Sequence, residues 1–76
     1  MQVNSSVRVP MNNFLVCFYA EETEPTHRVL VKQNGNDGAW EKAKAYFLNQ
    51  GIPSNELASF TVENYGQAKI DGINVI

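Results

Sequence analysis

Short hydrophobic runs alternate along the chain with polar segments, and the longest such run is FLVCFYA at residues 14–20. Its length and its aromatic and β-branched residues predict a strand over residues 13–20. Residues 27–33, HRVLVKQ, alternate between apolar and polar side chains and predict a second strand. Because the polar link between them, EETEPT, is short, the two strands are expected to form an antiparallel hairpin.

A helix is predicted over residues 39–50, AWEKAKAYFLNQ, where apolar residues recur at steps of three and four. The preceding loop, NGNDG, offers Asn36 or Asp37 as the N-cap, since either side chain can accept a hydrogen bond from a free backbone N–H. Gly51 stands where a left-handed residue closes a helix.

After a polar link, residues 57–64 alternate as LASFTVEN and predict a half-buried third strand. The remaining residues contain the hairpin dipeptide Asp71-Gly72, which predicts either a short hairpin or a single bulged strand.

These elements predict a small α+β domain in the order β-β-α-β-(β). Its antiparallel sheet of three or four strands carries one α-helix on one face. Residues 13–76 form this single domain, because 76 residues cannot supply two cores. Residues 1–12 are predicted to be an N-terminal arm or an edge strand.

Charge and cysteine content narrow the classes of function. Six Lys and Arg against eight Asp and Glu give a net charge of −2, and the basic residues are scattered, which argues against nucleic-acid binding. Cys17 is the only cysteine, so no intramolecular disulfide is expected, as is typical of a reducing compartment. With no signal-peptide pattern and no run long enough to cross a bilayer, the expected location is the cytoplasm, with no membrane partner.

Candidate catalytic and ligand-binding chemistry is sparse. The only histidine, His27, can approach Cys17 only across the hairpin, and the spacing offers no third group to orient a nucleophilic pair. The acids of EETEP lack the spacing of a calcium loop, and the chain contains neither GxxxxGK[ST] nor GxGxxG. We therefore predict a non-enzymatic protein with no cofactor, no metal and no catalytic residue.

A single helix covers only one face of the sheet, so half of the apolar strand at residues 14–20 needs another cover. The exposed set is either Leu15, Cys17 and Tyr19 or Phe14, Val16 and Phe18. The cover is expected to be the N-terminal arm with Val3, Val7 and Val9, a second copy of the chain, or a different partner.

This open face, or an unpaired edge strand, predicts a protein-binding module with a protein partner or a second copy as a homodimer. The predicted partner-binding residues are Leu15, Cys17, Tyr19, Arg28, Leu30, Lys32 and Thr61. The alternative is a single-stranded nucleic-acid-binding domain on the same face, with Tyr19 or Phe18 stacking on bases and Arg28 and Lys32 meeting phosphates. In size and layout the chain resembles accessory proteins of phages and other mobile elements, which implies binding to a host protein.

Overall fold

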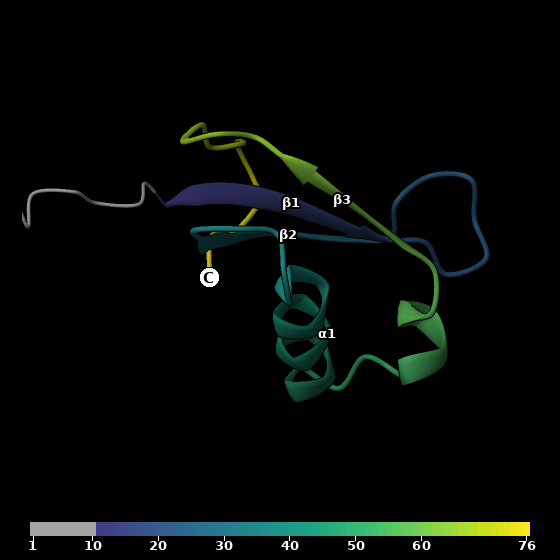
Figure 1. Ribbon diagram of the computed structural model, residues 1–76. Helices are drawn as coiled ribbons and strands as arrows, with labels where there is room; N and C mark the ends of the chain where they lie inside the picture. Colours follow the sequence, from purple (N-terminus) through teal and green to yellow (C-terminus); the bar gives the residue numbers. More distant parts are fainter. Residues whose placement is uncertain (1–10) are drawn as a thin grey trace, which may run out of the picture.

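A three-stranded antiparallel sheet forms the centre of the protein (Figure 1). The computed structural model describes residues 11–76. Strand β1 (Asn12–Phe18) lies in the middle, between β2 (His27–Gln33) and β3 (Phe60–Asn64), in the order β2-β1-β3. Val16 of β1 is the partner of Val29 on one side and of Val62 on the other. The predicted hairpin of the first two strands is therefore confirmed.

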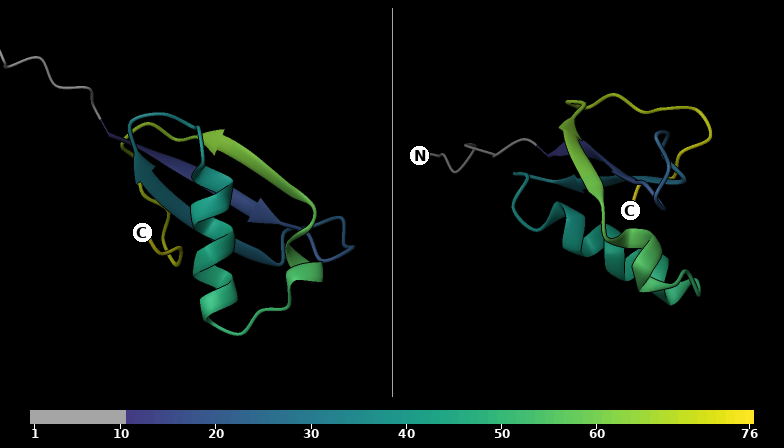
Figure 2. Two further views of the ribbon diagram at one scale, coloured as in Figure 1. Left: turned by 60° about the horizontal axis from the view of Figure 1, so that its bottom comes forward. Right: turned by 90° about the vertical axis from the view of Figure 1, so that its right-hand side faces the viewer.

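Helix α1 (Ala39–Asn49) crosses one face of the sheet, and a short 3-10 helix, η1 (Ser54–Leu57), leads from it toward β3 (Figure 2). The prediction of a side-chain N-cap is wrong. The N-cap residue is Gly38, with a φ of 77° and no side-chain hydrogen bond, and the first turn begins with a bond from the Ala39 N–H to the Asn36 carbonyl. At the other end, Gly51 has a φ of 90° and the Ile52 N–H bonds the Phe47 carbonyl, which confirms the predicted left-handed closure.

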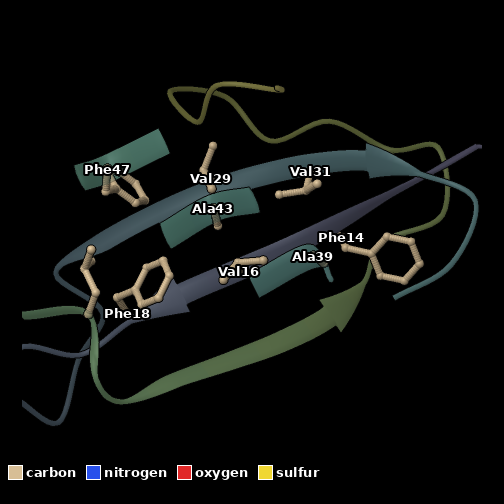
Figure 3. Close-up of a cluster of buried hydrophobic side chains, with 9 residues drawn as sticks. Phe14, Val16, Phe18, Val29, Val31, Ala39, Ala43 and Phe47 are labelled. Carbon is tan, nitrogen blue, oxygen red and sulfur yellow. The ribbon is translucent and has the colours of Figure 1, made fainter. Parts of the chain in front are cut away.

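The main hydrophobic core lies between α1 and the sheet. Its strand residues alternate along β1 and β2, because side chains on a strand alternate between faces. Figure 3 shows these side chains pointing toward the helix. The buried members are Phe14, Val16, Phe18, Val29, Val31, Ala39, Ala43, Phe47 and Leu57. Burying a Val, Leu or Phe side chain contributes about 1.5 to 3 kcal/mol, so this cluster is the main source of stability.

The opposite face of the sheet is covered by residues 65–76, which we call the C-terminal segment. Figure 2 (right) shows this yellow segment on the side of the sheet away from α1. Neither predicted alternative for this segment, a short hairpin at Asp71-Gly72 or a single bulged strand, forms. A turn there, with a bond from the Ile73 N–H to the Ile70 carbonyl, returns the chain to the edge of β2, where Val75 forms a parallel bridge with Leu30.

The α+β class, the β-β-α-β order and the single helix on one face of an antiparallel sheet are as predicted. Asn12, which was assigned to the arm, belongs to β1. Residues 1–10 of that predicted arm, including Val3, Val7 and Val9, lie outside the described residues.

Candidate functional site

The predicted partner-binding face is largely closed. Leu15, Cys17 and Leu30 form a second buried cluster and are only 7%, 6% and 0% exposed. Ile70 and Ile73 of the C-terminal segment pack against them. These three side chains therefore do not form an open surface in the described structure. We expected a second copy, a partner or the N-terminal arm to cover them. The cover is instead the C-terminal segment of the same chain.

The other four predicted residues lie around this cover. Tyr19 is half-buried, and its hydroxyl lies 3.1 Å from the Thr61 hydroxyl. Arg28 is exposed opposite Cys17, and Lys32 is exposed toward the other end of β2. Because the covered Leu30 stands between Arg28 and Lys32 on the strand, the two cations do not form a continuous basic track, and the geometry adds no support for the nucleic-acid alternative.

A hollow of about 430 Å³ lies beside Lys32. Its lining consists of Met11, Asn13, Lys32, Gln67, Lys69 and Val75. Asn13 is the buried polar member, and its side-chain amide donates to the Ala68 carbonyl at 2.7 Å. That amide nitrogen is therefore occupied within the fold, and the two lysines are exposed.

Cys17 and His27 lie on opposite faces of the sheet. Cys17 faces the C-terminal segment, whereas the His27 ring packs 5.4 Å from the Phe47 ring on the helix side and its Nε2 lies 3.0 Å from Glu56 Oε1. Burial raises the pKa of the Cys17 thiol, an effect that the Thr61 side chain and Arg28 oppose and Glu63 reinforces. A protonated thiol without a neighbouring base is a poor nucleophile, so this pair carries no catalytic geometry.

The acidic loop between β1 and β2 gathers no ligand set. Within residues 11–76, no three His, Cys, Asp or Glu side chains come together in an arrangement that could hold a metal ion. In the same part of the chain, no helix is long and apolar enough to cross a membrane.

Strand β3 is the least buried of the three strands. The Tyr19 N–H donates to the Ser59 carbonyl, and the Tyr65 N–H donates to the Asn13 carbonyl. These two bonds mark hydrogen-bonded pairs at the two ends of the β1–β3 pairing, and such pairs alternate along antiparallel strands. Thr61 and Glu63 therefore direct their main-chain groups toward β1, while Phe60, Val62 and Asn64 direct theirs outward.

We call these outward N–H and C=O groups of Phe60, Val62 and Asn64 the β3 edge. In the sheet order β2-β1-β3, no further strand of residues 11–76 lies beyond it. The edge of β2, by contrast, is partly paired, because the Leu30 N–H donates to the Asn74 carbonyl and the Ile76 N–H to the Leu30 carbonyl. An unpaired row of main-chain donors and acceptors is a template for another strand.

Two stacked aromatic rings stand beside the β3 edge on the helix side. The Trp40 and Phe60 ring centroids are 4.9 Å apart and their planes are 11° from parallel. Phe60 is 38% exposed, and Val62 next along the face is half-buried against the main core. We call Trp40 and Phe60 the aromatic ledge.

Strand β3 carries neither lysine nor proline, two residues that commonly protect an edge strand. The sequence FTVEN has a single charge, at Glu63. A bulge follows only after the strand, where Tyr65 and Gly66 both bond to Asn13. The alternation in residues 57–64 predicts a half-buried strand but does not indicate that this strand has a free edge. The missing information was the strand order, which decides which strand lies outermost.

Comparisons with protein-family models, with curated proteins and with solved structures give no match for this chain.

Proposed function

We propose that the protein is a non-enzymatic interaction module that binds an extended segment of a protein partner, or of a second copy, by adding it as a strand to the β3 edge. One observation carries this proposal: the outward main-chain groups of Phe60, Val62 and Asn64 lie unpaired within residues 11–76, beside the partly exposed aromatic ledge. In strand addition, main-chain hydrogen bonds supply affinity and alternate side chains supply specificity.

The side chains around the β3 edge define the chemistry of the added segment. On the helix side, Phe60 and Val62 offer apolar contacts, so apolar residues are expected at alternate positions of the segment. On the other side of the sheet, Thr61 and Glu63 are exposed, so a basic or hydroxyl residue is expected at the positions of the segment that alternate with its apolar ones. The size and layout of the chain imply that this segment belongs to a host protein, and that identity stays a prediction.

Hydrogen exchange followed by NMR tests this proposal at single residues. The probe is a set of ten-residue synthetic peptides that alternate valine with lysine or threonine, added to dilute labelled protein. In the free protein, the amides of Phe60, Val62 and Asn64 are expected to exchange quickly and those of Thr61 and Glu63 slowly. A bound strand slows the first three amides and leaves the other two unchanged.

A pair of variants provides the control. Asn64→Pro removes one outward N–H and places a ring at the edge, a position where an edge strand tolerates proline. Asn64→Ala loses the same side-chain bond to the Gly66 N–H but keeps the outward donor. Peptide protection that survives Asn64→Ala and is lost in Asn64→Pro supports the proposal. If no peptide protects these amides, or if Asn64→Pro binds equally well, strand addition at this edge is wrong.

A further inference from the structure

We infer that the strand added to the β3 edge is β3 of a second copy, paired antiparallel about a two-fold axis that passes through Val62. This inference rests on the proposed function and names its partner. It follows from the match of β3 to itself in hydrogen bonding and in charge, and from the apolar surface that the contact would bury.

The main-chain groups of two β3 strands are complementary in this register. Val62 pairs with the partner's Val62, and Phe60 pairs with the partner's Asn64. Because all of these residues direct their N–H and C=O groups outward, each is placed to form a hydrogen-bonded pair. The pairing joins the two sheets into one, in the order β2-β1-β3-β3-β1-β2, with both helices on the same face.

The single charge of β3 selects this register over its neighbour. When Val62 faces Val62, Thr61 lies opposite the partner's Glu63, so a hydroxyl group meets each carboxylate. If the partner strand slid by two residues so that Val62 faced the partner's Asn64, Glu63 would lie directly opposite the partner's Glu63. Like charges at such a position are destabilising. A shift in the other direction would leave Asn64 outside the paired part of β3.

The aromatic ledge adds apolar surface to the contact between the two copies. Phe60 projects on the helix side of the edge and is 38% exposed, and the stacked Trp40 ring is only half-buried. In the proposed pair, each Phe60 ring lies beside the partner's Asn64 and each Val62 meets its counterpart. Apolar surface that faces water in one copy is thereby removed from water.

The first test is the solution mass of the wild-type chain over a wide range of concentration, by sedimentation equilibrium. We expect a transition from 8.5 kDa to twice that mass. The transition should move to much higher concentration in Asn64→Pro and stay in place in Asn64→Ala. Amides of Phe60, Val62 and Asn64 in the wild-type chain should exchange more slowly as the protein concentration rises, a readout that needs no variant.

The second test fixes the register by disulfide formation. In the proposed pairing, Thr61 and the partner's Glu63 form a non-hydrogen-bonded pair, with Cα atoms about 4.5 Å apart, a separation that a disulfide can bridge. Thr61→Cys and Glu63→Cys chains, each made with Cys17→Ala to remove the neighbouring native thiol, are mixed and oxidised. The mixture should cross-link several-fold faster than either chain alone.

The outcomes separate the inference from the proposed function. A chain that stays at 8.5 kDa at every concentration overturns the self-pairing, and peptide protection of the β3 edge would then still support strand addition from another protein. A dimer that is indifferent to Asn64→Pro and shows no preferential Thr61 to Glu63 cross-link uses a different surface. That result also overturns the inference.

Discussion

The ring of Trp40, in the first turn of α1, stacks on the ring of Phe60, the first residue of β3. The pair connects the helix to the edge strand, and Phe18 lies next to it, with its ring centroid 6.2 Å from that of Phe60. Lys44 adds its ammonium group 5.7 Å from the Trp40 ring centroid. Aromatic contacts therefore hold the edge of the sheet to the helix, and the Phe60 ring in these contacts is partly accessible to solvent.

The stack predicts a measurable coupling between Trp40 and Phe60. In a double-mutant cycle with Phe60→Leu and Trp40→Leu, the two losses of unfolding free energy should not add. The expected coupling is about 0.5 to 1.5 kcal/mol, the contribution of an aromatic pair beyond its buried area. Urea unfolding, at a concentration where the chain is monomeric, measures each corner of the cycle. Additivity within about 0.3 kcal/mol would show that the stack does not stabilise the fold.

The C-terminal segment should control the reactivity of Cys17. Because Ile70 and Ile73 cover the buried thiol, a thiol reagent should label the native protein slowly and the urea-unfolded protein quickly. Ile73→Ala should speed native labelling, since it opens the cover directly. Ile52→Ala is the matched control, because Ile52 packs on the main core on the other side of the sheet. Equal acceleration by both variants would mean that labelling reports only global unfolding.

The raised pKa of Cys17 also predicts the direction of a pH effect. The folded protein favours the protonated thiol, so the stabilising contribution is complete below the pKa of the unfolded thiol. It is lost as the pH rises through the higher pKa of the folded state. The unfolding free energy of the wild-type chain should therefore fall more steeply in the alkaline range than that of Cys17→Ala. Parallel pH profiles of the two chains would contradict this.

Most of the fold follows from local patterns in the sequence. The alternation in residues 27–33 and the spacing of apolar residues in the helix are set by neighbours in the chain, and both elements form as the patterns predict. The cover over Leu15 and Cys17 does not follow from such a pattern. The dipeptide Asp71-Gly72 favours a turn, but whether the two arms pair with each other or dock on a sheet depends on an apolar surface formed by distant strands.

The β3 edge could not be predicted from the sequence for a related reason. The alternation in residues 57–64 predicts a half-buried strand, and the structure contains that strand at Phe60–Asn64. Its edge is free of a further strand because β1 occupies the centre of the sheet, an order that residues 11–76 adopt in three dimensions. Nothing in the local alternation of FTVEN specifies which strand lies at the edge, because the register and order depend on contacts far apart in sequence.

Gly51 and Gly35 should respond differently to the same substitution. Gly51 closes α1 with a φ of 90°, a conformation that costs a residue with a Cβ about 1 to 2 kcal/mol. Gly35 shows no such φ, and an added Cβ there meets nothing within 4 Å. Gly51→Ala should therefore lower the unfolding free energy by about 1 kcal/mol, while Gly35→Ala leaves it unchanged or slightly raised. Thermal unfolding of both variants makes the comparison, and similar losses would show that the helix end does not require glycine.

Two adjacent residues of η1 should differ sharply in their contribution to stability. Leu57 is 1% exposed within the main core, so Leu57→Ala should cost about 2 to 5 kcal/mol through lost contacts and the cavity that remains. Glu56 bonds His27, but its side chain is 38% exposed. Glu56→Ala should therefore cost less than about 1 kcal/mol. Urea unfolding of both variants measures this contrast, with Leu57→Val as the milder replacement if Leu57→Ala does not fold. A Glu56→Ala loss as large as that of Leu57→Val would mean that η1 is held by its polar bond to β2 rather than by the buried leucine.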